Sequence, residues 1–298
     1  MSHSPANPVE ITLPAHAKIN WWLEILGKRP DGYHELFTIF QSISLADEVR
    51  VGLRAAPGIE LDLSDPHLPS GPGNLAWRAA EAFLQAWGEP RGVKIALRKH
   101  IPAGAGLGGG SSDAAAVLRA LNRLAGEPFS RERLAEIAAG LGSDVPFFLF
   151  GGTAVGLGRG EIVRPSPVQV VDEVILVVWP RFAVPTAEAY RWIQAVRKAS
   201  RLTEADLDTR MRAFRRVVTE RRWCDLRNDF QAAVFSRFPV LQAIRHRLHE
   251  AGAGGVWLSG SGSALFALGP SEALQEAAKS PRLTELAGCF LVRTVGAY

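Results

Sequence analysis

Apolar and polar residues alternate along an early segment of the chain, residues 18–26. One side carries the apolar residues Ile19, Trp21, Leu23 and Ile25, and the other carries Lys18, Asn20, Trp22 and Glu24. A period of two is typical of a β-strand whose apolar face lies in the core. On this pattern alone, Lys18 is expected on a solvent face.

A tight turn is predicted after this strand, at Pro30, Asp31 and Gly32. Proline presets φ and glycine adopts a positive φ at little cost. A second strand over residues 33–43 would complete a hairpin. Tyr33 and His34 emerge just after the turn, and from the residues alone they are an ordinary strand tyrosine and a surface histidine.

Helical spacing appears in two later segments. The first helix carries Val117, Leu121 and Leu124 on one face, and the second carries Leu134, Ile137, Ala138 and Leu141 and stops at Gly142. Residues 93–99 alternate as a half-buried strand, and residues 151–160 are interpreted as a glycine-rich hairpin because no helix start follows them.

The segment between the strand at 93–99 and the first helix contains five glycines in seven residues, 104–110. Glycine lets consecutive N–H groups point to one place, and a helix N-terminus adds free donors. We therefore predict a phosphate site here. Its members are Pro102, Gly104, Gly106, Leu107, Gly108, Gly109, Gly110, Ser111 and Ser112.

Other interpretations of these glycines exist. Gly104, Gly106 and Gly109 also fit G-x-G-x-x-G, the dinucleotide-binding motif. The preceding strand, however, alternates instead of being continuously apolar. Glu127, the acidic residue at the spacing expected for binding a ribose, lies in a turn and not at the end of a second strand. No Gly-Lys-Ser/Thr follows, which excludes a Walker A loop. A glycine-rich turn without a ligand stays open.

Asp144 precedes the apolar run at residues 147–150. A carboxylate beside so apolar a run is costly unless it is paired or functional, so Asp144 is a candidate acid-base residue with Lys18 as its partner. The alternative is an N-cap of the next turn. Asp113, by contrast, is expected to be a helix-dipole partner in a first turn.

Chain length, cysteine content and the length of apolar runs limit the class of protein. A length of 298 residues predicts two domains. The two cysteines, Cys224 and Cys289, suggest neither a disulfide framework nor a zinc site, which fits a reducing compartment. No apolar run is long enough to span a bilayer, so we expect a soluble, cytoplasmic protein without membrane partners.

The net charge is only +4, yet residues 191–227 hold ten arginines and one lysine against five acidic residues. A nucleic-acid surface is one interpretation. Because no nucleic-acid motif accompanies the charge, we favour a solvated helical face beside a site for anionic small molecules, and no nucleic-acid partner.

Three segments together resemble the GHMP kinases, a superfamily of small-molecule kinases. They are Pro-x-Gly-x-Gly-Leu-Gly-Gly-Gly-Ser-Ser at residues 102–112, Ala-Lys-Ile-Asn at 17–20 with Gly-Lys-Arg-Pro-Asp-Gly-Tyr-His-Glu-Leu at 27–36, and Leu-Ser-Gly-Ser-Gly-Ser at 258–263. The resemblance runs in family order from about residue 14 to the last strands. It reverses the expectation for Lys18, which it places near the reacting hydroxyl.

The resemblance implies an α+β fold with an N-terminal domain similar to ribosomal S5 domain 2 and a C-terminal ferredoxin-like domain, with the active site in the cleft between them. The expected borders are residues 1–164 and 165–298, and a last strand near 290–298 is free to return to the first domain. The oligomeric state, monomer or dimer, stays open.

The same resemblance implies ATP and Mg²⁺ as cofactors and catalytic roles for Lys18 and Asp144. Asn74 matches a position near the adenine, and no metal ligand is identified beyond the weak candidates Ser111 and Ser112. The segment at 27–36 is specific to the branch of the family that phosphorylates the 2-hydroxyl of 4-diphosphocytidyl-2-C-methylerythritol, in the non-mevalonate isoprenoid pathway. By this resemblance the substrate-binding residues are Asn20, Tyr33, His34, Thr186, Tyr190, Ser259, Gly260, Ser261 and Gly262.

Three other functions stay open on the sequence. Another GHMP small-molecule kinase would share the motifs. A nicotinamide oxidoreductase would use the G-x-G-x-x-G match, and a non-catalytic nucleotide- or RNA-binding protein would use the glycine loop and the arginine-rich segment.

Overall fold

The computed structural model describes residues 10–193 and 202–298. It contains two compact units, each assembled from several stretches of chain. The first unit comprises Met1–Ala17, Ala46–Ile101 and Gly108–Leu149, and the second comprises Lys18–Leu45, Pro102–Leu107 and Phe150–Tyr298. Two long strands, β1 (Glu10–Lys28) and β2 (His34–Arg54), contribute residues to both units. The domain border expected near residue 165 stays a prediction.

The sheet of the first unit contains the second half of β2 together with β4 (Gly92–Arg98) and β3 (Gly58–Leu63). Strand β4 pairs antiparallel with β2 and parallel with β3. Its apolar residues Val93, Ile95 and Leu97 are buried, whereas Lys94 is exposed. The half-buried strand predicted over 93–99 is therefore confirmed.

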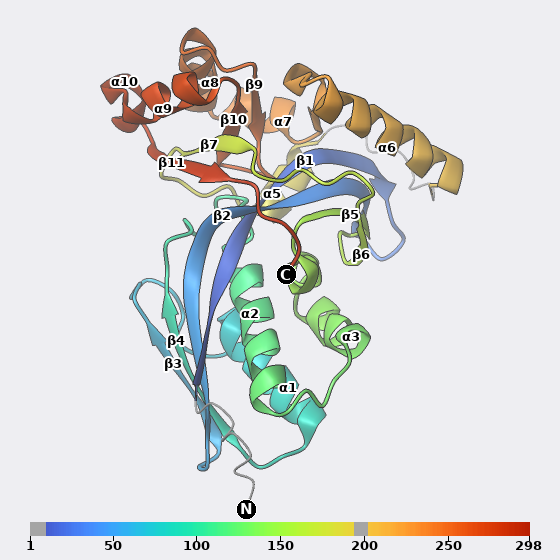
Figure 1. Ribbon diagram of the computed structural model, residues 1–298, viewed down its shortest axis with the longest axis vertical. Helices are drawn as coiled ribbons and strands as arrows, with labels where there is room; N and C mark the ends of the chain where they lie inside the picture. Colours follow the sequence, from blue (N-terminus) through green and yellow to red (C-terminus); the bar gives the residue numbers. More distant parts are fainter. Residues whose placement is uncertain (1–9, 194–201) are drawn as a thin grey trace, which may run out of the picture. The chain divides into compact units, whose positions relative to one another are not determined.

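Helices α1 (Leu75–Trp87), α2 (Gly109–Leu124), α3 (Arg131–Leu141) and α4 (Phe147–Phe150) complete the first unit, apart from the last residue of α4. Helix α1 packs against α2 and α3 (Figure 1). The face of α2 predicted from Val117, Leu121 and Leu124 is buried. Helix α3 ends where the sequence predicts, with Gly142 as its C-cap.

One seven-stranded sheet has the order β3-β4-β2-β1-β8, with β5 paired to β2 and β6 paired to β5. Its strands β5 (Thr153–Gly158), β6 (Ile162–Pro165) and β8 (Arg227–Asn228), together with the first half of β2 and the second half of β1, belong to the second unit. The predicted β1/β2 hairpin is confirmed, because the amide of Arg29 donates to the carbonyl of Tyr33 at 2.7 Å and Gly32 has a φ of +86°. Strands β5 and β6 form the hairpin interpreted from residues 151–160.

The other sheet of this unit is antiparallel, in the order β11-β7-β10-β9. These strands are β7 (Val174–Trp179), β9 (Gly255–Leu258), β10 (Leu265–Leu268) and β11 (Gly288–Arg293), joined by α5 (Thr186–Trp192), α6 (Glu204–Thr219), a 3₁₀ turn (Trp223–Asp225), α7 (Gln231–Arg237), α8 (Pro239–Glu250), α9 (Ser271–Lys279) and α10 (Pro281–Thr284). Helices α8, α9 and α10 lie along the same sheet (Figure 1). Their apolar residues, such as Ile244 and Leu274, share one core with Leu176 and Leu265 of the strands.

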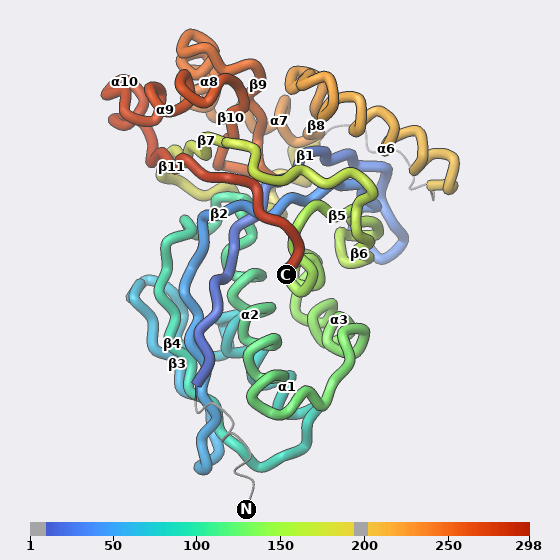
Figure 2. Tube along the Cα trace, viewed as in Figure 1, coloured from blue at the N-terminus to red at the C-terminus, as the bar shows by residue number. Residues whose placement is uncertain are grey.

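The C-terminal end of the chain continues past β11 (Figure 2). The last strand expected near residue 290 is β11, which pairs with β7. Beyond it, Thr294 bridges to Ile43 and Ala297 bridges to Gly151. Thus the tail residues, and not the strand itself, pair with the segments around β2 and β5.

Candidate active site

Lys18 lies in β1 with 3% of its surface exposed, so the solvent-facing position suggested by the alternation is wrong. Its Nζ donates to Oδ1 of Asn20 at 2.7 Å, and Nδ2 of Asn20 donates to Oγ1 of Thr38 at 2.7 Å. Oγ1 of Thr38 donates in turn to the carbonyl of Trp22, also at 2.7 Å. Because a buried amino group is costly unless it is hydrogen-bonded, this chain of contacts holds Nζ of Lys18 in a fixed position.

Lys18 and Asn20, on the polar face of β1, are buried because other elements of the second unit cover them. Nζ of Lys18 lies 5.9 Å from the ring centroid of Phe40 in β2. The backbone amide of Lys18 donates to the carbonyl of Leu107 at 2.9 Å. A period of two identifies which face is apolar, but it does not tell whether the opposite face is covered.

The loop between β9 and β10 contacts the backbone of the first part of the glycine-rich segment. Oγ of Ser259 donates to the carbonyl of Gly106 at 3.0 Å. A Cβ on Gly106 would lie 2.2 Å from the carbonyl oxygen of Ser259, and Gly106 has a φ of +79°. A Cβ on Gly260 would lie 3.0 Å from Nζ of Lys18. The structure thus brings together Lys18, Gly106, Ser259 and Gly260, all selected from sequence.

Two more contacts hold this loop in place. Nδ2 of Asn228 donates to the carbonyls of Leu258 and Gly260 at 2.7 and 2.8 Å. Oγ1 of Thr186 lies 3.0 Å from Oγ of Ser261. The sequence points to Thr186 and Ser261, but it gives no signal for Asn228, whose role depends on a contact distant in the chain.

Helix α2 begins at Gly109, within the last residues of the glycine-rich segment 104–110. Gly108 is its N-cap, with a φ of +73° and no side chain that caps the first turn. The first N–H groups of a helix have no intrahelical acceptor, and together with the helix dipole they favour an anion. Ser111 is partly exposed at this end, whereas Ser112 is buried.

The individual glycines of the helix start have different surroundings. A Cβ on Gly109 would lie 3.0 Å from Cγ2 of Ile101 and 3.3 Å from Nζ of Lys99, so this residue packs on buried groups of the first unit. Gly110 is exposed, and a Cβ there would meet only Leu75, at 3.7 Å. Of these two positions, only Gly110 is free on its Cβ side.

Asp113 is not a first-turn dipole partner, and that expectation is wrong. It is 2% exposed and accepts from Nζ of Lys99 at 2.6 Å, while Lys99 also pairs with Asp47. Burial raises the pKa of Asp113, the charge of Lys99 lowers it and that of Asp47 raises it, to a value of about 7. Oδ1 of Asp113 has no hydrogen-bond partner in the described part of the chain. The Asp47–Lys99–Asp113 cluster therefore joins the start of α2 to β2 and to the residue that follows β4.

Two other candidates of the first unit lie at helix ends. Asp144 lies partly buried in the turn between α3 and α4, ahead of the buried Phe147 and Phe148, as the sequence predicts. Asn74 is the N-cap of α1: its Oδ1 accepts from the amide of Ala76 at 2.9 Å, and its Nδ2 donates to the carbonyl of Pro69 at 3.0 Å. The pairing of Asp144 with Lys18 and the place of Asn74 near adenine stay predictions.

Aromatic side chains selected from sequence meet in the second unit. The ring of His34 stacks on that of Tyr190, with centroids 4.6 Å apart and 11° between the planes. Phe230 contacts Tyr190 edge-on at 4.9 Å. Tyr33 is 54% exposed, and the guanidinium carbon of Arg159 lies 4.6 Å from its ring centroid. Arg159, which sequence reasoning missed, lies in the glycine-rich segment assigned to the β5/β6 hairpin.

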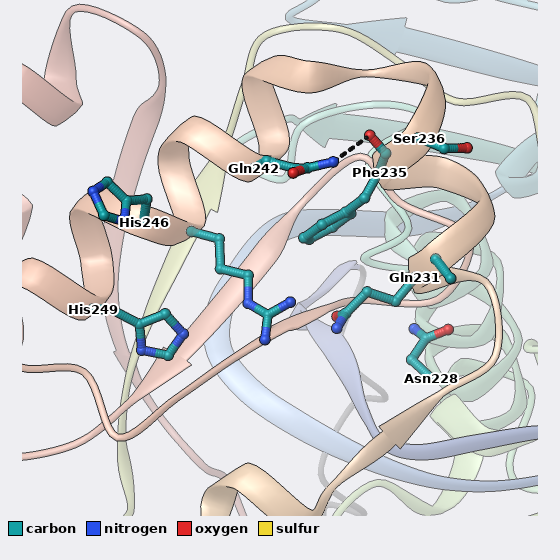
Figure 3. Close-up of a pocket in the computed structure, with 9 residues that line it drawn as sticks. Asn228, Gln231, Phe235, Ser236, Gln242, His246 and His249 are labelled. Atoms are coloured by element: carbon teal, nitrogen blue, oxygen red, sulfur yellow. Dashed lines mark hydrogen bonds between the residues drawn. The ribbon is translucent and has the colours of Figure 1, made fainter.

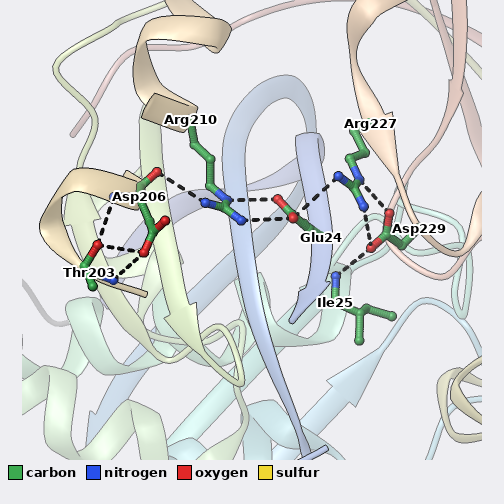
Figure 4. A network of polar contacts seen from close by, with 7 residues as sticks. All are labelled: Glu24, Ile25, Thr203, Asp206, Arg210, Arg227 and Asp229. Atoms are coloured by element: carbon green, nitrogen blue, oxygen red, sulfur yellow. Dashed lines mark hydrogen bonds and ion pairs between the residues drawn. The ribbon is translucent and has the colours of Figure 1, made fainter. Parts of the chain in front are cut away.

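An ion-pair network attaches α6 to β1 (Figure 4). Arg210 contacts Glu24 with two nitrogens at 2.9 and 3.0 Å, and Arg227 bridges Glu24 and Asp229. Burial acts to raise the pKa of Glu24, but the two arginines outweigh it and hold that pKa below its usual value. Part of the arginine-rich segment is therefore structural; its residues 194–201 lie outside the described residues.

Comparison with known proteins identifies the family. The model of the GHMP kinases N terminal domain matches residues 74–152, and that of the GHMP kinases C terminal domain matches residues 207–282. Proteins named 4-diphosphocytidyl-2-C-methyl-D-erythritol kinase from Geobacter metallireducens and Solibacter usitatus are 43% and 46% identical, over 88% and 86% of this chain and 90% and 80% of theirs. The chain belongs to the 4-diphosphocytidyl-2-C-methyl-D-erythritol kinase family of GHMP kinases.

Solved structures agree with this family. A crystal structure of 4-(cytidine 5'-diphospho)-2C-methyl-D-erythritol kinase is 36% identical, with a TM-score of 0.78 over 96% of this chain and 100% of that one. Homoserine kinase from Cytophaga hutchinsonii, at 18% identity and a TM-score of 0.72 over 100% of this chain and 98% of that one, shares the fold. The predicted α+β fold of the GHMP kinases is confirmed, and the oxidoreductase interpretation of the glycines is wrong. Within the described residues, no helix has the length and apolar character needed to cross a bilayer.

Proposed function

We propose that this chain transfers the γ-phosphoryl group of ATP to the 2-hydroxyl of 4-diphosphocytidyl-2-C-methyl-D-erythritol, in the non-mevalonate isoprenoid pathway. The observation that carries this proposal is the identity of 43% to a relative of that name over 88% of the chain. The two free cysteines support action in the reducing cytoplasm.

The glycine-rich segment and the start of α2 are proposed to hold the phosphates of ATP. The uncapped first turn of α2 supports this role, because it offers backbone donors and the positive end of the helix dipole. In-line transfer forms a bond from the substrate oxygen to the γ-phosphorus and breaks the bond from that phosphorus to the β–γ bridging oxygen. Because the transition state spreads negative charge over oxygens, preorganised donors contribute most of the catalysis.

Mg²⁺ fits this site as an ion that arrives with the nucleotide. The described residues contain no group of three or more His, Cys, Asp or Glu placed for a metal. Mg²⁺ keeps several waters and is often held by one or two protein groups plus phosphates, so a complete protein cage is unnecessary. Ser111 and Ser112 are the hydroxyls proposed to assist it. When bound, the ion neutralises charge on the phosphates.

Lys18 and Asp144 are proposed as the catalytic side chains. The buried, hydrogen-bonded Nζ of Lys18 supports a fixed positive charge that stabilises developing negative charge on the transferred group. Asp144 accepts the proton of the substrate hydroxyl. A loose transition state requires little early proton transfer, so Asp144 also orients that hydroxyl.

The aromatic group formed by His34 and Tyr190 is proposed to bind the cytosine ring, with Tyr33 on its exposed side. Burial, and then the charge of Lys28, lower the pKa of His34, so the imidazole is neutral at pH 7 and has one donor and one acceptor nitrogen. Thr186 and residues 259–262 are proposed to contact the remainder of the substrate. The cytidylyl group then anchors the substrate remote from the reacting hydroxyl.

The decisive experiment measures ADP release from ATP and Mg²⁺ with a panel of acceptors. The panel contains 4-diphosphocytidyl-2-C-methyl-D-erythritol, methylerythritol 4-phosphate, mevalonate, homoserine and galactose. We expect turnover with the cytidylylated compound alone, and equal turnover with methylerythritol 4-phosphate would contradict the cytosine site. Activity only with mevalonate, homoserine or galactose would assign the chain to a different GHMP reaction.

A further inference from the structure

An open surface pocket of about 590 Å³, which we call the cavity, lies between α7 and α8 of the second unit (Figure 3). Cavities that take small ligands commonly measure about 300–1,000 Å³. Its walls include Gln231 and Phe235 from α7 and Arg245, His246 and His249 from α8. No residue of the proposed reaction lines it.

The cavity wall is rich in hydrogen-bond donors and in cationic or protonatable groups. None of its nine described residues is Asp or Glu. Arg245 makes no hydrogen bond or ion pair within residues 10–193 and 202–298, and its guanidinium carbon lies 5.9 Å from the ring centroid of Phe235. A guanidinium resting on an aromatic ring keeps its N–H fork available for a planar or tetrahedral oxyanion.

Other donors accompany Arg245. Oε1 of Gln231 accepts from the amide of Leu258 at 3.0 Å, which orients its Nε2 amide as a donor with no acceptor in the described part of the chain. Nδ1 of His249 lies 3.0 Å from the carbonyl of Ala253, so this nitrogen carries a hydrogen. Nε2 of His249 has no hydrogen-bond partner in the described part of the chain. His246 adds no free donor at Nε2, because that nitrogen lies 3.2 Å from Oε1 of Glu250.

We propose that this cavity binds a small phosphate-bearing molecule, with Arg245 as the anchor of the phosphate and Nε2 of Gln231 as a second donor. Phosphate presents several acceptor oxygens and a dianionic charge, which matches one arginine with amide and imidazole groups around it. The exposed methyl group of Ala232 would contact the organic part of the molecule. This site is additional to the proposed reaction and does not depend on its substrate.

The cavity is connected to the loop beside Lys18. Gln231 holds the amide of Leu258, and Asn228, which also lines the cavity, holds the carbonyls of Leu258 and Gly260. Gly260 in turn lies next to Nζ of Lys18. A ligand that contacts Gln231 therefore acts on the backbone of this loop.

The test is calorimetric titration of the full chain with inorganic pyrophosphate, while a non-hydrolysable ATP analogue and 4-diphosphocytidyl-2-C-methyl-D-erythritol together saturate the proposed reaction site. We expect one remaining binding event, weakened by about tenfold or more in Arg245→Gln because a charge-assisted contact is lost. Arg215→Gln is the control, since it removes the same charge from an exposed position of α6. Equal thermal unfolding of both variants checks their folding. Absence of binding in the saturated parent, or equal weakening in both variants, overturns the proposal.

A second readout follows the loop itself. Pyrophosphate should slow hydrogen exchange in the peptide covering residues 255–263 of the parent and of Arg215→Gln, but not of Arg245→Gln. Glycerol 3-phosphate, titrated in the same way, tests whether a phosphomonoester binds at this site as pyrophosphate does. Binding of pyrophosphate or glycerol 3-phosphate that is insensitive to Arg245→Gln contradicts the site.

Discussion

The imidazole of His34 lies face to face with the phenol ring of Tyr190, with ring centroids 4.6 Å apart and 11° between the planes. One ring follows the β1/β2 turn and the other comes from α5, so the contact joins two distant parts of the sequence. Phe230 holds Tyr190 from the edge, at 4.9 Å. Because the pKa of His34 is lowered by burial and by Lys28, two neutral rings form this stack at pH 7.

Removing the ring of Tyr190 should weaken the cytidylylated substrate specifically. Base stacking contributes about 1–3 kcal/mol, so Tyr190→Ala is expected to raise the KM for this substrate about 5- to 150-fold, with the KM for ATP unchanged. Tyr190→Phe keeps the ring and should resemble the parent. Steady-state kinetics for each substrate measure the effect, and a Tyr190→Ala enzyme with a normal KM would remove this ring from the base site.

Substitution of Tyr33 tests the exposed side of the same cytosine site. Tyr33→Ala should weaken the substrate over the same range, while ATP binding barely changes. Arg159, whose guanidinium carbon lies 4.6 Å from the Tyr33 ring centroid, offers a related variant. Arg159→Gln leaves the tyrosine in place and should have a smaller effect. If Tyr33→Ala treats the substrate like the parent, Tyr33 does not contact the base.

Loss of the Asp144 carboxylate should slow the chemical step. Asp144→Asn is expected to lower kcat by about 10²–10⁴-fold, the range for lost acid-base assistance, with ATP affinity nearly kept. Glu136→Gln removes an exposed carboxylate from α3 and serves as the control. Single-turnover rates separate chemistry from product release. Near-normal turnover of Asp144→Asn would exclude Asp144 from the mechanism.

Local patterns predicted the elements that position the site. The Pro30-Asp31-Gly32 turn, the alternating strand at β4 and the helix that follows the glycines all depend on neighbouring residues, and each is confirmed. The alternation along β1 did not predict the burial of Lys18, because that burial depends on β2 and on the backbone of Leu107. Whether the polar face of a strand is buried is decided by contacts with residues distant in the sequence.

The same limit explains the error at Asp113. An acidic residue soon after a helix start usually lies in solvent near the dipole. Here Lys99 of the preceding segment and Asp47 from β2 form a buried cluster with it, and neither partner is visible from the helix sequence. Asn228 was missed for a similar reason, since its amide contacts the carbonyls of Leu258 and Gly260.

Asp113 should make stability depend on pH. Its pKa is near 3.8 when unfolded and about 7 when folded, so between these values the folded state binds the extra proton, and its contribution to stability decreases as pH rises. The free energy of unfolding of the parent should therefore fall relative to that of Asp113→Asn between about pH 5 and about pH 8. Urea unfolding at both pH values measures this difference. Asp62→Asn, at an exposed position of β3, should show no such divergence, and parallel curves for Asp113→Asn would contradict the assignment.

The glycine-rich segment can be tested where a side chain does not disturb packing. At Gly106 a Cβ would lie 2.2 Å from the carbonyl oxygen of Ser259, and at Gly109 it would lie 3.0 Å from Cγ2 of Ile101, so substitutions there would disturb local packing as well as the phosphate site. Gly110, with only Leu75 at 3.7 Å, avoids this problem.

Gly110→Ala should therefore raise the KM for ATP while the protein stays folded. A methyl group on this exposed first turn of α2 restricts the approach of phosphate to the backbone donors, whereas alanine in a helix is intrinsically favoured over glycine by about 1 kcal/mol. Gly140→Ala is the matched control, because a Cβ at that helical position of α3 meets nothing within 4 Å. Both variants should melt at or above the temperature of the parent, and only Gly110→Ala should bind ATP more weakly in a calorimetric titration. If the two variants bind ATP equally well, the start of α2 does not hold the phosphates.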